Sequence, residues 1–578
     1  MMLAKNKLAI LFGAGAEQSF GLPNGGEFAI SLFTQKYDSL RSELRQALDT
    51  ITNKQSKNSN YIEWLNYTSP SINRISTFGK YDFEQVIMSS AEQKKHDIKE
   101  FLINIDKNAC SLCKKLIGDK SLTKNTIYED LKKALNLGDS DKNPIVEFNQ
   151  SFSGKNDYDA LLTSETISLI ISTLSQAHSN QITINPSQHE TLKECFRVLL
   201  FMIVITCGDE LLKKLNRGIF TSENESTHDY LALFEEMFTM KYDRATGIIY
   251  DFIQKQRPAF KDCPDTVERF INLIHRLTFN LCSTSIDYQM LIDNYFRYIM
   301  SPKTDWAKFT KMFLFLRAAY DAITSKENTL SDEALQKNSY YKDIISELKN
   351  DNARVEINAL ASTNYHDYYG RLVKLLNESA IEDNTLDEAS LEARFGKVMR
   401  LNGGVGEFYN PYKNSLVKRE PVNTAAEQDH SDNLFLYQNQ LVTSFFFTQS
   451  GIKPMTAIDI SCLYTEMYSK FKEADIIVVI GFNFNSDDNH INTIIRDLVE
   501  NHNKTLVLIT VGTDTAKALD DKKEEVCKKL RIDPTEAQAR VKVLNVDSES
   551  RVPTSMPGNS DLWLDYLANL KINNEPSH

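Results

Sequence analysis

The sequence predicts an α/β fold in which a parallel sheet with helical crossovers is interrupted by a large all-α insertion. An apolar run at 8–12 leads into a glycine turn and then a helical pattern, as expected for a first buried strand and its crossover. From 97 to 350 the apolar residues recur at helical spacing almost throughout. After 350, β-branched runs alternate with amphipathic helices, which indicates parallel strands joined by right-handed crossovers.

The glycine turn near the start of the chain is the first candidate site. The run at 8–12 ends at Gly13, Ala14 and Gly15, and a second turn-forming cluster at 21–26 precedes the next helix. In α/β proteins, a strand followed by a glycine turn and a helix start brings phosphate oxygens to backbone N–H groups. The segment therefore predicts a nucleotide site. An ordinary tight turn explains the same residues equally well, because short glycine motifs are common.

The helical block is expected to form a unit of its own. Its apolar residues form stripes on single helix faces, which are typical of packed cores, and no metal-ligand or catalytic spacing stands out among them. One such stripe consists of Phe270, Leu273, Ile274 and Leu277, at i, i+3, i+4 and i+7. The predicted division is 1–96 for the first part of the sheet domain, 97–350 for the helical insertion, and 351–578 for the second part of the sheet domain.

The C-terminal part of the chain carries the remaining strands. A strand at 355–360 leads into Thr363 and Asn364, and a strand at 397–401 ends at Asn402. Open α/β sheets place ligand contacts on small and polar residues at the carboxyl ends of their strands. The further elements expected are a long loop at 404–435, strands at 475–480, 505–511 and 541–546, and helices at 458–473 and 562–570.

Composition excludes several classes of protein. The 578 residues carry a formal net charge of −12, which argues against a broad nucleic-acid surface. The longest apolar run, at 198–205, is shorter than the ~20 residues of a membrane span, and no secretory signal precedes the first strand. Among the eight cysteines only Cys110 and Cys113 form a C-x-x-C, without a second pair, so no zinc site is expected. These features predict a cytoplasmic protein without membrane contact.

Four short elements stand in order on the two sides of the helical block. They are Gly13-Ala14-Gly15-Ala16 with Gly21-Leu22-Pro23, then Asp82-Phe83-Glu84, then Thr363-Asn364-Tyr365, and finally Ile480-Gly481-Phe482-Asn483-Phe484 with Asp488 and Ile491. Together they resemble the sirtuin-like family, and specifically its NAD-consuming members from bacterial anti-phage defence. The resemblance covers roughly 1–90 and 350–515, less than half of the chain, and leaves the helical block outside it.

The resemblance implies a Rossmann-like sheet of sirtuin type that binds NAD, as its substrate, at the carboxyl ends of the strands. The implied reaction is cleavage of the nicotinamide–ribose bond, after which water captures an oxocarbenium-like ribose. Asn364 would then meet the ribose or the attacking water, while Gly481 and Asn483 would face the adenosine end. The NAD-binding residues implied in this way are Gly13, Ala14, Gly15, Ala16, Pro23, Thr363, Asn364, Gly481, Phe482 and Asn483.

The sequence departs from the family pattern at the expected catalytic positions. Asn402 stands where the family has its general-base histidine, and an amide is not a base near neutral pH. His366 stands where the family has an aspartate, and it is either a substitute base or an ordinary histidine at a strand end. Glu17 and Glu84 would either assist or simply be solvated acids. Asn402 therefore marks a natural variant with another base, a catalytically silent scaffold, or a histidine replaced by design.

Three functions follow from these residues. The first is an NAD glycohydrolase that releases nicotinamide and ADP-ribose as an effector of anti-phage defence (abortive infection). By resemblance, such an enzyme would form a homo-oligomer and have a translocase-type ATPase as partner, and the missing four-cysteine module disfavours protein deacylation. The alternative, favoured by Asn402, is a catalytically silent platform or sensor that binds NAD or a related nucleotide. The third is an unrelated nucleoside-processing transferase.

Overall fold

The structure is a computed structural model in which the chain forms two compact units. The first consists of Met1–Asn24, Gln35–Thr77 and Phe296–His578, and the second of Gly25–Thr34 and Phe78–Tyr295. The residues that the structure describes are 5–21, 25–33, 37–53, 87, 90–117, 124–134, 164–178, 184–221, 249–255, 258–287, 305–327, 330–337, 339–377, 387–411, 413–418, 433–437, 440–446, 458–512, 515–532, 536–554 and 562–570.

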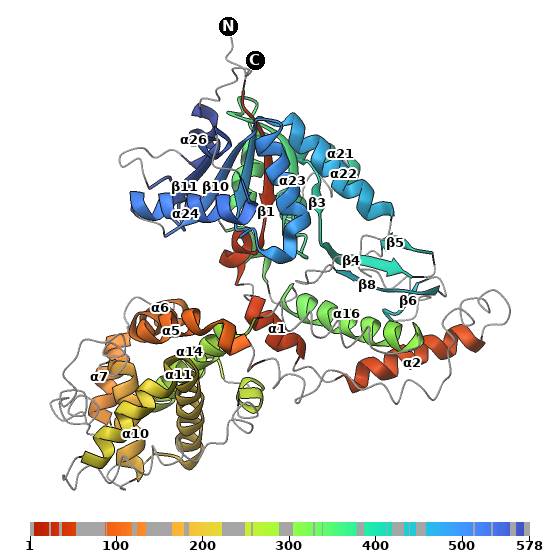
Figure 1. The fold of residues 1–578 in the computed structure, drawn as a ribbon. Helices are drawn as coiled ribbons and strands as arrows, with labels where there is room; N and C mark the ends of the chain where they lie inside the picture. The colour runs from red at the N-terminus through yellow and green to blue at the C-terminus, as the bar shows by residue number, and fades with distance from the viewer. Residues whose placement is uncertain are drawn as a thin grey trace. The chain divides into compact units, whose positions relative to one another are not determined.

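A six-stranded parallel sheet forms the centre of the first unit (Figure 1). Its strands are β1 (Lys7–Phe12), β2 (Glu356–Ser362), β3 (Val398–Arg400), β9 (Ile476–Ile480), β10 (Thr505–Val511) and β11 (Val541–Val546). They lie in the order β11-β10-β9-β1-β2-β3. The chain thus starts in the middle, moves outward through β2 and β3, and returns to the other side of β1. The order reverses between β1 and β9, as in Rossmann-like sheets, so the expected parallel α/β fold is confirmed.

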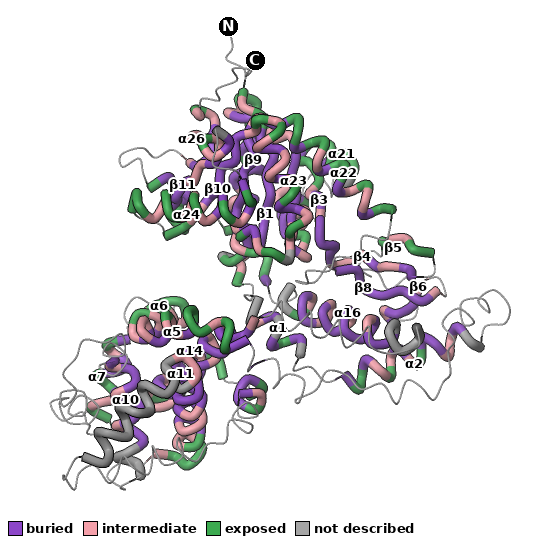
Figure 2. The backbone as a smooth tube through the Cα atoms, in the orientation of Figure 1, coloured by how far each residue is buried: buried purple, intermediate pink, exposed green. Residues whose placement is uncertain are grey.

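Both faces of this sheet are covered, and Figure 2 shows its strands buried. Alternate residues of β1 point to opposite faces: Ala9 and Leu11 belong to one core cluster, and Leu8, Ile10 and Phe12 to the other. The helices that contribute to the first cluster are α22 (Ile458–Glu473), α23 (Asn489–Glu500), α24 (Ala516–Leu530) and α25 (Glu536–Ala539). Those that contribute to the second are α17 (Asp332–Leu335), α18 (Tyr340–Lys349), α19 (Tyr368–Leu375), α21 (Glu388–Phe395) and α26 (Trp563–Asn569).

A small antiparallel sheet belongs to the same unit. Its order is β5-β4-β8, and a two-stranded hairpin, β6–β7, accompanies it. The strands are β4 (Gly403–Asn410), β5 (Ser415–Lys418), β6 (Leu436–Tyr437), β7 (Gln440–Leu441) and β8 (Thr443–Phe446), and the helices beside them are α2 (Asp38–Asn53) and α16 (Asp305–Glu327). The prediction of a loop at 404–435 is therefore wrong for β4 and β5. Three glycines in β4 hide its alternation, and pairing with β8 stabilises it.

The second unit is a bundle around a central helix. Its elements are α1 (Gly25–Phe33), α5 (Lys95–Ile103), α6 (Ile105–Ile117), α7 (Lys124–Ala134), α10 (Glu165–His178), α11 (Pro186–Thr221), η5 (Phe260–Asp262) and α14 (Thr266–Ser285). Helix α14 contacts α1, α5, α6, α7 and α11, and the Asp265 side chain caps its first turn by accepting from Glu268 N–H. The predicted stripe of α14, from Phe270 to Leu277, is buried. In the described part of the chain, no helix is long and apolar enough to cross a membrane.

The units differ in extent from the predicted division of the chain. Helices α16 to α18 fall within the predicted 97–350 block, yet they belong to the first unit. Tyr341, Ile344 and Ile345 of α18 pack in the same core cluster as Leu8 and Ile10 of β1. Conversely, α1 belongs to the second unit, where it packs on α14. Hydrophobic periodicity identifies these helices, but it does not tell which surface each one covers.

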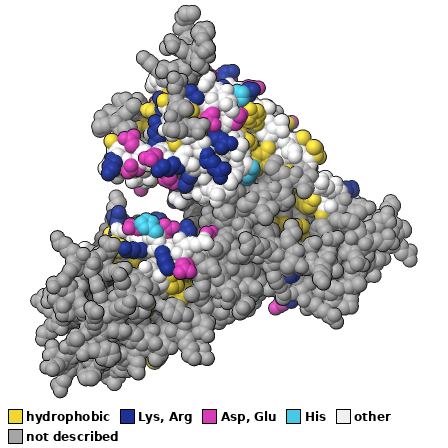
Figure 3. Space-filling model, viewed as in Figure 1, with side chains coloured by type: hydrophobic (Ala, Val, Ile, Leu, Met, Phe, Trp, Pro, Cys, Tyr) yellow, Lys and Arg dark blue, Asp and Glu magenta, His cyan; other side chains and the backbone are white. Residues whose placement is uncertain are grey.

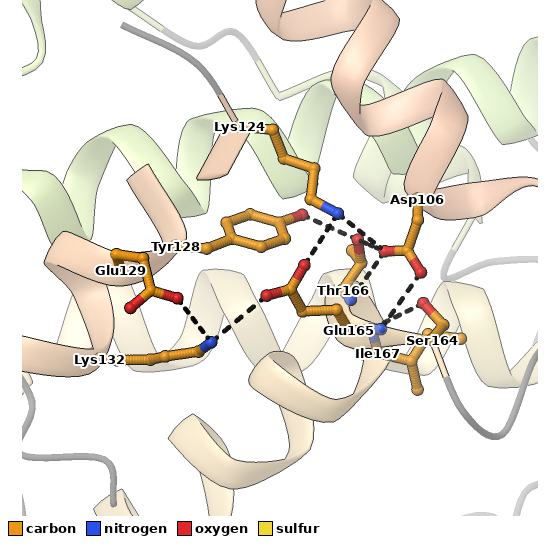
Figure 4. Close-up of polar contacts among 9 residues, drawn as sticks. All are labelled: Asp106, Lys124, Tyr128, Glu129, Lys132, Ser164, Glu165, Thr166 and Ile167. Carbon is orange, nitrogen blue, oxygen red and sulfur yellow. Dashed lines mark hydrogen bonds and ion pairs between the residues drawn. The ribbon is translucent and has the colours of Figure 1, made fainter. Parts of the chain in front are cut away.

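Partly buried polar contacts tie α6, α7 and α10 together (Figure 4). Asp106 of α6 accepts hydrogen bonds from the backbone N–H groups of Glu165 and Thr166, at 3.2 and 3.0 Å, and from the Thr166 hydroxyl at 2.5 Å. Lys124, only 8% exposed, lies 3.0 Å from the Glu165 carboxylate and 3.4 Å from that of Asp106. Asp106 thus caps the start of α10 from a neighbouring helix.

Candidate functional site

Two turns meet at the carboxyl ends of β1 and β9. Gly13 N–H donates to the Ile480 carbonyl and Gly15 N–H to the Gly481 carbonyl, each at 2.9 Å. A Cβ at Gly13 would lie 2.6 Å from the Gly481 oxygen, and one at Gly481, which has φ +69°, would lie 2.1 Å from Ala16 N. Only glycine fits this approach. The Gly13 and Gly15 N–H groups therefore donate to carbonyls of the neighbouring turn, whereas the sequence predicted that N–H groups of this turn would donate to phosphate oxygens.

The residues that follow form a short 3-10 helix, η1 (Ala14–Phe20), instead of an open loop. Ala14 is exposed at its start, Ala16 is buried, and Gly21 ends it in the left-handed region at φ 77°. Pro23 lies outside the described residues, as does the Asp82-Phe83-Glu84 element. The described part of this segment is thus a compact turn whose exposed residues are Ala14, Gln18 and Gly21.

The end of β2 places Thr363 and Asn364 beside this turn. Thr363 N–H donates to the Phe12 carbonyl at 3.0 Å, which continues the pairing of β2 with β1. Asn364 is 7% exposed, and its Nδ2 donates to the Gly13 carbonyl at 3.1 Å. The structure therefore brings together two of the sequence elements that are about 350 residues apart in the chain.

Asn402 follows β3 and lies beside Thr363 at the end of β2. Leu401 N–H donates to the Ser362 carbonyl at 2.8 Å, and Asn402 Nδ2 donates to the Thr363 carbonyl at 3.3 Å. The Asn402 side chain is buried, and its Oδ1 has no hydrogen-bond partner among the described residues. A buried acceptor without a donor is costly, so it marks a place where a ligand hydroxyl or water would be stabilising.

His366 is held in one orientation by its surroundings. Its ring stacks on Tyr368 at 4.7 Å, and Nε2 lies 3.4 Å from the Ile323 carbonyl. Because a carbonyl only accepts, Nε2 carries the proton and Nδ1 is the basic atom. Burial lowers the pKa of His366 from 6.5 to about 4. A base role would therefore have to use Nδ1, which lies 3.8 Å from Glu17 Oε2, and the ring is neutral at physiological pH.

A fully buried tyrosine completes the cluster, and sequence reasoning missed it. The hydroxyl of Tyr341, on α18, donates to Glu17 Oε1 at 2.5 Å, and Glu17 is only 1% exposed. Burial raises the pKa of Tyr341 well above its usual value, the Glu17 carboxylate adds to the rise, and a hydrogen bond from the Asn364 side chain opposes it. In the sequence, Tyr341 is one apolar position of an amphipathic helix, so nothing distinguishes it from a core residue.

The end of β9 contributes residues of different character. Phe482 is buried in the core and meets Phe484 edge-to-face at 5.2 Å, so its described role is packing. Asn483 is exposed, and its carbonyl accepts from Lys529 Nζ at 3.1 Å. Of these residues, only Asn483 offers a side chain to solvent at the end of this strand.

A separate cavity of about 440 Å³ runs along the open edge of β3. Six of its charged residues form ion pairs: Lys397 with Glu392, Arg400 with Glu407, and Lys470 with Glu466. The described surface in Figure 3 likewise shows basic and acidic side chains intermixed. In the described ranges, no three His, Cys, Asp or Glu side chains gather in a way that could hold a metal ion.

Comparisons of the chain with protein-family models, with curated proteins and with solved structures found no match. The chemistry of the site therefore rests on its own residues.

Proposed function

We propose that this chain binds NAD at the carboxyl ends of β1, β2 and β9 and cleaves its nicotinamide–ribose bond. The observation that supports this most is the meeting of the Gly13, Asn364 and Gly481 elements beside the reversal in strand order. Rossmann-like sheets hold dinucleotides in the crevice at such a reversal. The sirtuin type of the sheet and the all-α insertion are part of the same proposal.

The residues at this edge suit the bond cleavage only in part. Asn402 Oδ1 is a buried acceptor available to a ribose hydroxyl, and Asn364 offers an amide dipole close by. Oriented dipoles and the Glu17 carboxylate would stabilise the positive charge that develops on the ribose. Neither amide takes a proton from water, and His366 is a weak base because its pKa is about 4. Turnover by this chain is therefore expected to be slow.

The alternative is a silent platform or sensor that binds NAD or a related nucleotide. Asn402 and the neutral, buried His366 support it, because both remove a base from the site. The anti-phage role, the homo-oligomer, the ATPase partner and a cytoplasmic location rest on the sequence alone. A nucleoside-processing transferase is the third candidate, and its products differ from those of NAD cleavage.

The test is chromatography of NAD incubated with the wild-type chain and with Asn402→His, together with NAD binding by calorimetry. We expect the wild-type chain to bind NAD, and Asn402→His to release nicotinamide and ADP-ribose at least about 100-fold faster, because one placed base contributes about 10²–10⁴. Binding without turnover by either chain supports the platform. Absence of NAD binding by both overturns the site.

A further inference from the structure

We propose that Tyr464 and His490 are positioning residues that hold the peptide bond before Asn402. Tyr464 lies on α22 and His490 near the start of α23, two helices that pack on the same face of the parallel sheet. The consequence for NAD cleavage rests on the proposed function, because Asn402 belongs to that site. The hydrogen bonds themselves are a property of the protein without ligand.

The Tyr464 hydroxyl holds the carbonyl that precedes Asn402. Tyr464 is 6% exposed and packs in the same core cluster as Leu401. Its hydroxyl donates to the Leu401 carbonyl at 3.0 Å, and Leu401 N–H donates to the Ser362 carbonyl at 2.8 Å. The Leu401 carbonyl lies in one planar peptide unit with the N and Cα atoms of Asn402. Tyr464 therefore fixes the plane from which the Asn402 side chain starts.

The side chain of Asn402 depends on this plane for its position. Among the described residues, its Nδ2 donates to the Thr363 carbonyl at 3.3 Å, and its Oδ1 has no partner. A bond of 3.3 Å is longer than most N–H···O bonds in proteins. The backbone of the turn therefore contributes most to the placement of Oδ1, the atom that the proposed reaction offers to a ribose hydroxyl.

His490 determines the direction in which Tyr464 donates. Its Nε2 lies 2.7 Å from the Tyr464 hydroxyl oxygen, and the two rings meet edge-to-face at 5.2 Å. A hydroxyl has one proton, and a carbonyl only accepts. Because Tyr464 gives its proton to Leu401, Nε2 of His490 must carry a proton and donate it to the hydroxyl oxygen. If Nε2 had no proton, it would compete with the Leu401 carbonyl for the proton of Tyr464.

A second tyrosine–histidine contact on α22 provides a matched control. The Tyr468 hydroxyl, one helical turn further on, donates to Asp497 Oδ2 at 2.8 Å and lies 2.9 Å from Nε2 of His502. This pair therefore meets a carboxylate of α23 instead of the carbonyl before Asn402. Tyr468→Phe removes a hydroxyl from the same helix and leaves the Leu401 contact in place. A general loosening of α22 would appear in both variants.

The first readout is the carbonyl signal of Leu401 in the protein without NAD. Labelling with carbonyl-¹³C leucine and ¹⁵N asparagine selects the Leu-Asn steps, of which the sequence has six, and the signal of this step is assigned by its loss in Asn402→His. We expect Tyr464→Phe to shift the ¹³C signal away from its hydrogen-bonded position and Tyr468→Phe to leave it unchanged. An unchanged signal in Tyr464→Phe, or equal shifts in the two variants, overturns the positioning role.

His490 is tested in two ways. In mildly alkaline buffer, ¹⁵N-labelled histidine should show Nε2 of His490 as a protonated nitrogen, assigned by its loss in His490→Gln. His490→Ala should shift the Leu401 carbonyl signal, and His490→Gln should restore it, because the glutamine amide also donates. An unprotonated Nε2, or the same carbonyl signal in the wild-type chain and His490→Ala, overturns the role of His490.

The second readout is NAD cleavage by Asn402→His, which separates this inference from the proposed function. Added to Asn402→His, Tyr464→Phe should lower kcat about tenfold, the effect of one lost hydrogen bond, with KM changed less than about threefold. Tyr468→Phe should leave both constants unchanged, and equal losses in the two variants contradict the positioning role. If neither the wild-type chain nor Asn402→His binds NAD, the proposed function fails, and the Leu401 signal still decides on Tyr464 and His490.

Discussion

Two carboxylates, a half-buried one in the helical unit and a buried one in the sheet unit, are held in different ways. Asp106 of the helical unit accepts two backbone N–H groups and the Thr166 hydroxyl and lies beside the Lys124 ammonium (Figure 4). Burial raises its pKa, but the hydrogen bonds of Thr166 and the charge of Lys124 outweigh burial, so the pKa is lowered overall. Glu17 of the sheet unit meets the phenol of Tyr341 and the neutral ring of His366.

This difference indicates that Asp106 has a structural role, whereas Glu17 is a candidate functional residue. The negative charge of Asp106 compensates the N-terminus of α10, where backbone donors require a partner. Glu17 instead contacts two titratable groups with shifted pKa values, the Tyr341 hydroxyl and the His366 ring, on the turn that follows β1. Perturbed groups of this second kind gather at functional sites. Substitutions around Asp106 and substitutions around Glu17 are therefore expected to have different effects.

The largest effect is expected from Gly481→Ala. A Cβ there would lie 2.1 Å from Ala16 N and 2.4 Å from Gly15 C, in a residue with φ +69°. The turns at β1 and β9 would have to separate, at a cost of more than about 3 kcal/mol. Urea unfolding followed by tryptophan fluorescence measures this unit, because Trp563 is fully buried in it and the sequence of the other unit, 25–34 and 78–295, contains no tryptophan.

Gly512→Ala is the control for Gly481→Ala. Gly512 follows the next strand, β10, and has φ +78°, but nothing lies within 4 Å of its added Cβ. Only the backbone strain remains, which is worth about 1–2 kcal/mol. Equal losses in the two variants would show that the contact between the turns contributes little.

The second effect concerns Asp106 in the helical unit. Asp106→Ala should destabilise this unit by about 2–3 kcal/mol, because it leaves Lys124, 8% exposed, with only one carboxylate and uncaps α10. The loss should appear in far-UV circular dichroism and not in tryptophan fluorescence. Lys132→Ala, which removes the outer ion pairs with Glu129 and Glu165 and leaves Asp106 and Lys124 in place, is the control and should cost at most about 0.5 kcal/mol.

The smallest effect is the acid sensitivity that His366 adds to the sheet unit. Its folded pKa of about 4 lies below the unfolded value of 6.5, so only the unfolded chain gains this proton as the pH falls. Stability is therefore present above about pH 6.5 and is lost toward pH 4, by about 2 kcal/mol between pH 7.5 and pH 5. His366→Gln should show a correspondingly weaker pH dependence in urea unfolding. The same pH dependence in both chains would contradict a buried neutral ring.

Most of the parallel sheet could be predicted from the sequence. The expected strands at 505–511 and 541–546 agree with β10 and β11, and the run at 475–480 contains β9. Continuous β-branched runs predict strands of a parallel sheet because such strands are buried on both faces. The small sheet was missed, since the glycines of β4 carry no alternating pattern.

The candidate site could be predicted only in its parts. Asn364 and Asn402 follow strands whose ends meet at one edge, so their proximity follows from a parallel sheet. The use of the Gly13 and Gly15 N–H groups could not be foreseen, because it depends on a turn more than 460 residues away. The contact of Tyr341 with Glu17 could not be foreseen either, because in the sequence Tyr341 differs from the apolar residues around it only by its hydroxyl.

The sequence by itself determined which segments are strands and helices and which polar residues end the strands, because periodicity and turn residues act locally. The tertiary structure alone decided that β1 lies between β2 and β9, that α18 packs on the sheet, and that Glu17 meets Tyr341. These are contacts between distant segments, selected by the packing of whole faces. No local pattern carries that information.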